Sequence, residues 1–197
     1  KGQVIDAAMT DGSAVLMSMF NTAYEKGLHS LERGVNRLDG GAHFYDTYET
    51  RDGKYISIGS IEPQFYNQLL EVAELPREEF ADQMDRSRWP ELKRSIAGVF
   101  RQKTRDEWCE LMEGTDICFA PVLDLKEAQS HPHNLARQTY VEVGGIKQPA
   151  PAPRFSRTEP SVQHEARPYG ADTDAVLAEA GYSAEQLDQM RAQSACG

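Results

Sequence analysis

The sequence has few cysteines, and their spacing excludes two kinds of site. Only three occur in 197 residues, at Cys109, Cys118 and Cys196. A sparse, odd-numbered set is not a disulfide framework, and none of the three lies at the short spacing typical of zinc ligands. We therefore expect a reducing compartment, and the cytoplasm is the predicted location.

Basic residues and long apolar runs are also scarce. The chain has 21 Lys and Arg against 31 Asp and Glu, a formal net charge of −10. Nucleic-acid binders usually show a basic face, so we expect no nucleic-acid partner. No run of about 18 apolar residues occurs, so we expect no membrane span. The chain begins at Lys1 without a basic-then-apolar leader. This predicts no secretory signal, and the missing methionine suggests a start inside a longer protein.

The common local motifs of catalysis and phosphate binding are missing too. The sequence contains no G-x-S-x-G, no P-loop and no G-x-G-x-x-G, and Gly34, Gly40 and Gly41 form no phosphate-binding motif. His131 and His133 flank a proline and have no cysteine or carboxylate partner at ligand spacing. We expect no metal site.

A β-hairpin is the strongest local signal that is present. Residues 44–50 and 55–61 alternate between apolar and polar side chains, and Asp52-Gly53 lies between them. A further strand is expected at 117–123, at a sheet edge or strand end because of Pro121. A short buried strand is also expected at 3–7, although no partner strand lies near it in the sequence.

Helices are expected around this hairpin. Pro63 suits a first helical turn, and Thr104 with Glu107 forms a capping box, as Asp124 does with Glu127. The expected helices cover residues 15–27, 63–73, 87–103, 104–114 and 124–139, with two short ones beginning after Asp172 and Ser183. Residues 149–160 are proline-rich and predict an extended connector. The pattern as a whole predicts an α+β fold.

Glu62 is the strongest single candidate for a functional residue, because it lies where the hairpin ends and a helix begins. A carboxylate at a helix N-terminus is stabilised by the helix dipole by about 0.3–1 kcal/mol, which by itself explains a glutamate before Pro63. The alternative is an acid presented at a site rim, where it orients another catalytic group. Both interpretations stay open on the residues alone.

Histidine and methionine offer weaker candidates. His43 lies in the glycine-rich approach to the hairpin, and we interpret it as an ordinary loop histidine. Met9, Met17 and Met19 gather on the first helical segment. Methionine usually fills a core, and we favour that interpretation, but it also lines sites that accept varied apolar ligands.

Several stretches together resemble the α-methylacyl-CoA racemases, which belong to the family III CoA-transferase superfamily. The clearest are residues 2–16, 38–70, 88–100, 114–123 and 151–157, above all IEPQFY after the YDTY…DGKYI hairpin. The resemblance implies the small α+β domain of a family III CoA-transferase-like fold, flanked by remnants of a large Rossmann-like α/β domain. Its boundaries are then 1–37 for the last strand, helix and linker of the large domain, 38–148 for the small domain, and 149–197 for the connector and returning helices.

The resemblance also implies an activity. These racemases invert 2-methylacyl-CoA by moving a proton through an enolate, with coenzyme A thioester as substrate and no cofactor, in an intertwined homodimer. Their histidine–aspartate pair and coenzyme A loops match nothing in this chain. Glu62 is the residue that carries over, with a role in catalysis: it would orient the histidine and stabilise its charge. Met9, Met17, Met19, Gly40 and Gly41 would contact substrate.

Two other functions stay open. One is a family III CoA-transferase, which transfers coenzyme A between carboxylic acids through an aspartate nucleophile. The other is a non-catalytic domain that only associates with other chains.

Overall fold

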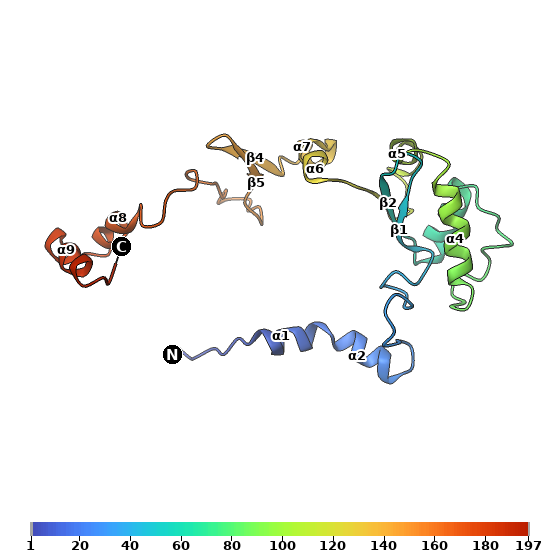
Figure 1. The fold of residues 1–197 in the computed structure, drawn as a ribbon, viewed down its shortest axis with the longest axis horizontal. Helices are drawn as coiled ribbons and strands as arrows, with labels where there is room; N and C mark the ends of the chain where they lie inside the picture. Colours follow the sequence, from blue (N-terminus) through green and yellow to red (C-terminus); the bar gives the residue numbers. More distant parts are fainter. Residues whose placement is uncertain (1, 197) are drawn as a thin grey trace. The chain divides into compact units, whose positions relative to one another are not determined.

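The computed structural model describes residues 2–196 (Figure 1). Contacts within the chain divide it into two compact units, residues 1–123 and 124–197, and each is described by itself. This division reflects one chain alone and does not test the domain boundaries expected from the sequence, which stay a prediction.

The first unit opens with two short helices and no strand. Helix α1 covers Met9–Leu16 and α2 covers Ser18–Glu25. The strand expected at residues 3–7 is wrong, because no neighbouring strand offers the ladder bonds that an isolated strand lacks. The single helix expected at 15–27 is interrupted at Met17, and α2 is followed by Gly27 at φ +69°.

The hairpin forms as expected and becomes part of a three-stranded sheet. Strand β1 covers Tyr45–Glu49, β2 covers Tyr55–Gly59 and β3 covers Phe119–Val122. The order is β1-β2-β3 and both pairings are antiparallel, with Tyr48 opposite Ile56 and Ile58 opposite Phe119. Pro121 therefore stands in an edge strand, where the proline costs least.

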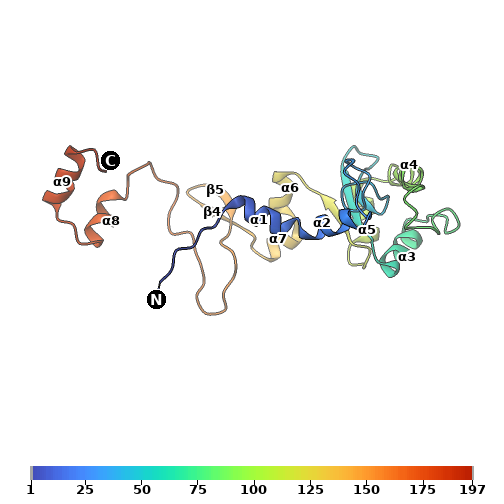
Figure 2. The same cartoon turned by 90° about the horizontal axis from the view of Figure 1, so that it is seen from below.

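Three helices complete the first unit. Helix α3 covers Pro63–Val72, α4 covers Trp89–Phe100 and α5 covers Arg105–Met112, and all three were expected (Figures 1 and 2). Thr104 caps α5 in the expected box. Helix α4 runs beside β1, where Arg101 pairs with Glu49 at 2.7 Å and Lys93 pairs with Asp46. These ion pairs connect α4 to β1, one of the two edge strands of the sheet.

One core lies between the sheet and these helices. Its buried side chains are Ala42, Phe44, Tyr48, Ile56, Ile58, Tyr66, Leu69, Leu70, Ala73, Leu75, Phe80, Trp89, Leu92, Ile96, Phe100, Trp108, Met112 and Ile117. Every one of them belongs to residues 42–117. The opposite face of the hairpin, which carries Tyr45, Thr47 and Ser57, is left at the surface.

The second unit is made of short elements. They are α6 (Leu125–Ser130), α7 (Pro132–Ala136), β4 (Tyr140–Val143), β5 (Ile146–Pro149), α8 (Thr173–Glu179) and α9 (Ala184–Ala192). The caps at Asp124 and Ser183 are confirmed. The helix expected from 124 to 139 breaks at Pro132, which cannot continue the helical hydrogen bonding. The β4–β5 hairpin was not expected.

The mixed helices and antiparallel strands confirm the α+β class. The longest helix among residues 2–196 is α4, with 12 residues. A bilayer span needs about 20 apolar residues in one helix, and none of the described helices is of that kind.

Candidate functional site

Glu62 occupies the N-cap position of α3, and its carboxylate is left unused by the helix. Its backbone is extended at φ −72° and ψ 142°, and its carbonyl accepts the first helical hydrogen bond from Tyr66 N at 3.0 Å. The side chain makes no capping hydrogen bond and is exposed. The start of the helix therefore fixes the position of Glu62, and the carboxylate makes no hydrogen bond to the helix N-terminus.

Hydrogen bonds to the core hold the segment between the end of β2 and Glu62. Ser60 is fully buried: its amide donates to Phe44 O at 3.0 Å and its hydroxyl to Ile117 O at 2.5 Å. The carbonyls of Ser60 and Ile61 both accept from the side-chain amide of Gln83, each at 3.0 Å. The backbone that precedes the exposed Glu62 is therefore fixed by hydrogen bonds.

A thiol lies close to this acid. Cys118 is exposed, and the negative charge of Glu62 helps to raise its pKa, after the larger effect of partial burial. A Cβ placed on Gly59 would lie 3.8 Å from the Cβ of Cys118. No local sequence pattern indicates this neighbour, because Cys118 lies 56 residues beyond Glu62 and the β2–β3 pairing brings the two segments together.

A shallow pocket of about 440 Å³ covers the outer face of the hairpin next to this thiol. Its lining residues are Leu38, Asp39, Gly40, Tyr45, Asp46, Thr47, Ser57, Ile58, Gly59 and Cys118. Gly40, expected to contact substrate, therefore faces the same pocket as the thiol beside Glu62. Its carbonyl accepts from the Lys93 ammonium, which also pairs with Asp46.

Gly41 is adjacent but has a packing role. Its amide donates to Asn36 O at 3.0 Å. A Cβ on Gly41 would lie 2.5 Å from Val35 C and 2.6 Å from Asn36 O, closer than real side chains approach backbone. The missing side chain lets two stretches of the loop touch, and nothing in the structure tests whether Gly41 also meets a substrate.

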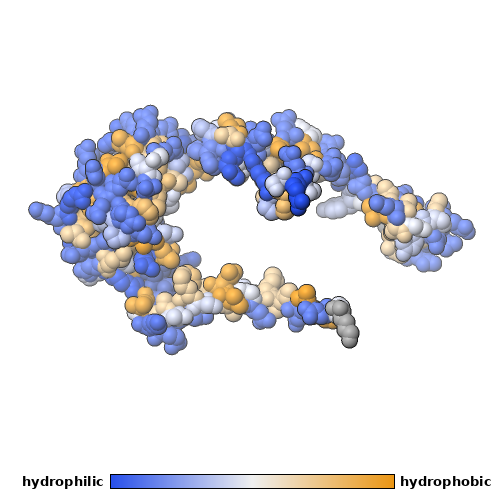
Figure 3. Space-filling view, turned by 180° about the vertical axis from the view of Figure 1, so that it is seen from behind, coloured by the Kyte–Doolittle hydropathy of each residue, from blue (hydrophilic) through white to orange (hydrophobic). Residues whose placement is uncertain are grey.

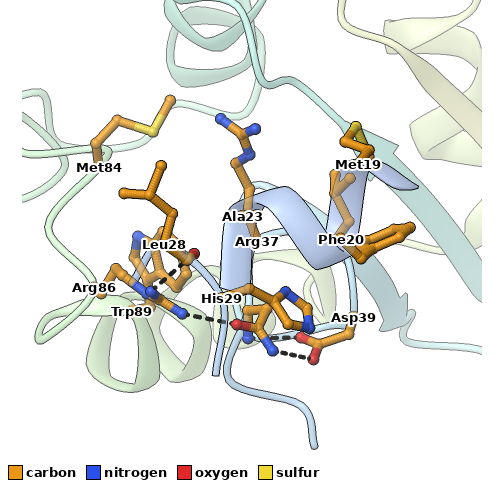
Figure 4. A pocket seen from close by; sticks show the side chains of 12 residues that line it. Met19, Phe20, Ala23, Leu28, His29, Arg37, Asp39, Met84, Arg86 and Trp89 are labelled. Carbon is orange, nitrogen blue, oxygen red and sulfur yellow. Dashed lines mark hydrogen bonds between the residues drawn. The ribbon is translucent and has the colours of Figure 1, made fainter. Parts of the chain in front are cut away.

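A second pocket of about 440 Å³ is lined by Met19 and by other apolar side chains (Figure 4). Met19 and Phe20 from α2 form one side, and Leu28, Met84 and Trp89 form the other. Arg37 and His29 also line it. Leu38 and Asp39 line both pockets, which makes the loop before the hairpin their common wall.

A hydrogen-bond network stiffens that wall. Asn36 is buried, and its side chain donates to Asp39 Oδ2 at 2.8 Å and accepts from Arg86 at 3.0 Å. The Arg86 guanidinium lies over the ring of Trp89, 5.5 Å from its centroid. Partial burial acts to raise the pKa of Asp39, but the hydrogen bonds from Asn36, Gly34 and Gly41 outweigh it and leave that pKa lowered.

The other two methionines do not reach this pocket. Met9 is 89% exposed, Met17 47% and Met19 61%. The interpretation of all three as core residues is therefore wrong for this chain. Figure 3 shows apolar surface along α1 and α2, where Val15 and Leu16 are also exposed. A methionine-bearing surface exists, but Met19 is the one of the three that lines a cavity.

His43 is not a loop histidine at the surface. It is 0% exposed, and its Nε2 lies 2.7 Å from the hydroxyl of Tyr66. That hydroxyl donates its single hydrogen to Phe80 O at 3.1 Å, so it accepts the hydrogen bond from Nε2–H of His43. Burial, helped by the positive charge of Arg88, lowers the pKa of His43 to about 4. His43 therefore belongs to the core beneath the hairpin.

The remaining histidine candidates lie in or beside helix α7. His131 is the N-cap residue of α7 and His133 lies in that helix, exposed. Within residues 2–196, no three histidine, cysteine or acidic side chains gather into a group that could hold a metal ion.

Comparison with known proteins adds a family and two groups of relatives. The profile of CoA-transferase family III matches residues 1–173. Over 96% of the chain, the sequence is 44% identical to an alpha-methylacyl-CoA racemase of Mus musculus and 41% identical to one of Homo sapiens. Over 91% of the chain it is 25% identical to a human succinyl-CoA:glutarate CoA-transferase. The chain spans about half the length of the two racemases, 50% of each.

Solved structures support the fold. Rv3272 of Mycobacterium tuberculosis is similar with a TM-score of 0.61 at 22% identity, over 82% of this chain and 42% of its own. A CaiB/BaiF family protein from Brucella suis is similar with a TM-score of 0.63 at 19% identity, over 91% of this chain and 48% of its own. At such identities the likeness concerns the fold alone.

Proposed function

Because this chain belongs to CoA-transferase family III, we propose that it is the part of a 2-methylacyl-CoA racemase that presents Glu62 to the reacting centre. The observation that carries this proposal is the identity of 44% and 41% to two alpha-methylacyl-CoA racemases over 96% of the chain. Identity to the human CoA-transferase is 25%. The racemase is therefore the better supported activity within the family.

The proposed reaction is a proton transfer at the carbon next to a thioester carbonyl. A base removes the α-proton, the electron pair moves into an enolate, and an acid returns a proton to the opposite face. No atom is gained or lost overall, and the chemistry calls for no redox or metal group. The base and acid are the histidine and aspartate that the resemblance implies, which lie outside these 197 residues.

Glu62 would act on that histidine rather than on the substrate. A carboxylate that accepts a hydrogen bond from an imidazole fixes its tautomer and stabilises its cationic form. The role requires an acid on a rigid support with its oxygens free. Glu62 has both properties, since its carboxylate makes no capping bond and the two preceding carbonyls are held by Gln83.

Binding of the acyl-CoA would use the two pockets and the surface beside them. Gly40 would meet substrate at the hairpin pocket, with Gly41 shaping the loop behind it. Met19 would contact the apolar acyl chain in the pocket that it shares with Phe20 and Trp89. Met9 and Met17, both exposed, would extend that apolar surface along α1 and α2.

An intertwined homodimer is part of the proposal. The apolar side chains of Val4, Ile5 and Leu16 are 97%, 77% and 81% exposed in the single chain. Burying such a side chain stabilises a protein by roughly 1.5–3 kcal/mol, so these residues favour association with further polypeptide.

The test uses the natural protein that contains this chain. We expect it to convert one epimer of a 2-methylacyl-CoA into a mixture of both and, in D₂O, to incorporate one deuterium at the α-carbon. Chiral chromatography and mass spectrometry measure the two products. If no 2-methylacyl-CoA exchanges its α-proton, the proposal is wrong.

CoA transfer is the second candidate, supported by the family itself and by the transferase relative. Transfer passes through a covalent coenzyme A thioester on the enzyme and depends on an acceptor acid. Trapping that thioester by mass spectrometry, together with acceptor-dependent turnover and no α-deuteration, would establish it in place of the racemase. Absence of both activities would favour a non-catalytic domain.

A further inference from the structure

Gln83 lies directly beneath the approach to Glu62 and makes two bonds there. It is 9% exposed, and its side-chain nitrogen donates to Ser60 O and to Ile61 O, each at 3.0 Å. A primary amide carries two N–H hydrogens, so this geometry uses both. The two acceptors are the consecutive carbonyls that precede Glu62.

Gln83 is itself held in place. Its backbone carbonyl accepts from the indole nitrogen of Trp89 at 2.9 Å. Trp89 opens α4, is 4% exposed and packs edge-to-face against Phe44 with the ring centroids 5.8 Å apart. The amide of Gln83 therefore reaches Ser60 and Ile61 from a fixed point in the core.

The stretch that Gln83 holds has no regular structure to hold it otherwise. Strand β2 ends at Gly59, and α3 begins at Pro63. In between, the amide of Ile61 turns back to Gly59 O at 2.9 Å, which leaves the Ser60 and Ile61 carbonyls outside both the sheet ladder and the helix. Gln83 supplies a bond to each.

These bonds constrain the direction of the Glu62 side chain. Ile61 O belongs to the peptide group whose nitrogen is Glu62 N, so fixing that carbonyl fixes the plane entering Glu62. On the other side, Pro63 restricts Glu62 to an extended ψ, observed at 142°. With both flanking peptide groups held, the Cα–Cβ bond of Glu62 has one orientation although its carboxylate makes no capping hydrogen bond.

We propose that Gln83 is a positioning residue for Glu62: its side-chain amide sets the orientation from which the Glu62 carboxylate reaches the catalytic histidine. The proposal rests on the proposed racemase function. It assigns a role to a residue 21 positions away from Glu62, in a loop that carries no motif.

The experiment is a double-mutant cycle in the natural protein that contains this chain. Gln83→Met keeps the length of the side chain and removes both donors. Ile96→Val, a substitution in the same core away from the site, is the control for loss of stability. Each is made with Glu62 intact and with Glu62→Gln, and α-deuteration of a 2-methylacyl-CoA gives kcat, KM and their pH dependence. If Gln83→Met fails to fold by circular dichroism, Gln83→Leu replaces it, since a leucine side chain is also apolar and donates nothing.

With Glu62 intact, we expect Gln83→Met to lower kcat roughly tenfold, because catalytic groups tolerate little misplacement, and to leave KM within about twofold. Its pH profile should shift in the same direction as that of Glu62→Gln. In the Glu62→Gln background the same substitution should change kcat by less than about twofold, since there is no carboxylate left to position. Ile96→Val should leave kcat unchanged in both backgrounds.

The outcomes separate the two proposals. If the wild-type protein exchanges no α-proton, the racemase function is overturned and the role of Gln83 falls with it. If the wild type is active and Gln83→Met retains its kcat, the positioning role alone is overturned. An equal loss of kcat in both backgrounds also overturns it, because the effect would then not pass through Glu62.

Discussion

At Glu62 the two interpretations of one residue predict different results for one substitution. Glu62→Gln keeps size and hydrogen-bonding capacity but removes the charge. No capping bond is lost, so the stability cost should stay below about 1 kcal/mol, the size of the helix-dipole effect. If Glu62 supports a catalytic imidazolium, kcat in the natural protein should fall by about 10-fold to 100-fold, with a lower histidine pKa in the pH profile. Kinetics across pH and urea unfolding measure both effects.

The matched control is Glu71→Gln, on the same helix and equally free of capping. Glu71 is exposed and lies 3.9 Å from Arg77, a contact of little energetic value at the surface. Glu71 lies in the last turn of α3, where the helix dipole disfavours a carboxylate, so Glu71→Gln should be neutral or slightly stabilising, and only Glu62→Gln should slow the reaction. A Glu62→Gln protein with wild-type kcat and pH optimum would reduce Glu62 to a helix-start residue.

His43 makes a separate prediction, about stability in acid. Its pKa is about 4 in the folded protein, against about 6.5 in an unfolded chain, so the unfolded state binds the extra proton first. Stability from this residue is fully present above about pH 6.5 and is lost as the pH falls towards 4, by about 3 kcal/mol in all. The groups around the ring, Tyr66, Phe44 and Phe80, offer no counter-charge to an imidazolium.

The substitution that tests this is His43→Gln, which can still donate to Tyr66 but does not titrate. Urea unfolding on both sides of pH 6.5 should show the stability advantage of the wild type shrinking in acid, relative to His43→Gln. His133→Gln, at an exposed histidine, is the control for the loss of an imidazole outside the core. A constant difference between wild type and His43→Gln across this range would contradict the assignment.

The sequence could indicate some of these residues and not others. The helix start at Glu62 and the capping boxes follow from residues that are neighbours in the sequence, so they can be predicted from it. The burial of His43 depends on Tyr66 and Phe80, and the role of Gln83 depends on Ser60 and Ile61. All of these are more than 20 residues away in sequence from their partners. No local pattern reports such contacts.

At the scale of elements, two glycines give opposite predictions for the same substitution. Gly41→Ala forces a Cβ against the backbone of Val35 and Asn36, so it should destabilise the first unit by about 1–3 kcal/mol. Gly98→Ala places a Cβ on the exposed face of α4 with nothing within 4 Å, so it should stabilise by about 0.5–1 kcal/mol. Urea unfolding of both variants beside the wild type measures the signs. Equal effects at the two positions would refute the close contact at Gly41.

The elements with a strong local sequence pattern were predicted correctly. The hairpin has strand alternation around a turn, and α3, α4 and α5 have an apolar face with a proline or a capping box at the start. The errors concern weaker or conflicting signals. The capping box of Asp124 and Glu127 predicted a helix that continues through His131, where Pro132 ends it. The turn at Gly144–Gly145, with both φ angles positive, was not recognised as the centre of a second hairpin.

At the scale of the whole molecule, the distribution of the core separates what one chain can stabilise from what it cannot. The buried core of the first unit draws on residues 42–117, while residues 2–8 form no helix or strand until α1 begins at Met9. A sequence pattern at residues 3–7 that favours a buried strand therefore conflicts with the structure of the single chain. The conflict is resolved if those residues are buried by polypeptide that these 197 residues do not include, as the proposed dimeric racemase requires.

Amide hydrogen exchange decides this point. In a monomeric sample of the 197-residue chain, we expect the amides of residues 3–7 to exchange at nearly unprotected rates, and those of β2, whose neighbours are both strands, to be the slowest. In the natural protein that contains this chain, residues 3–7 and α1 should gain protection, because Val4, Ile5 and Leu16 would then be covered. The amides of β2 serve as the internal reference in both samples. Strong protection at residues 3–7 in the monomer would mean that the chain buries them by itself, and unprotected residues 3–7 in the natural protein would remove this support for the homodimer.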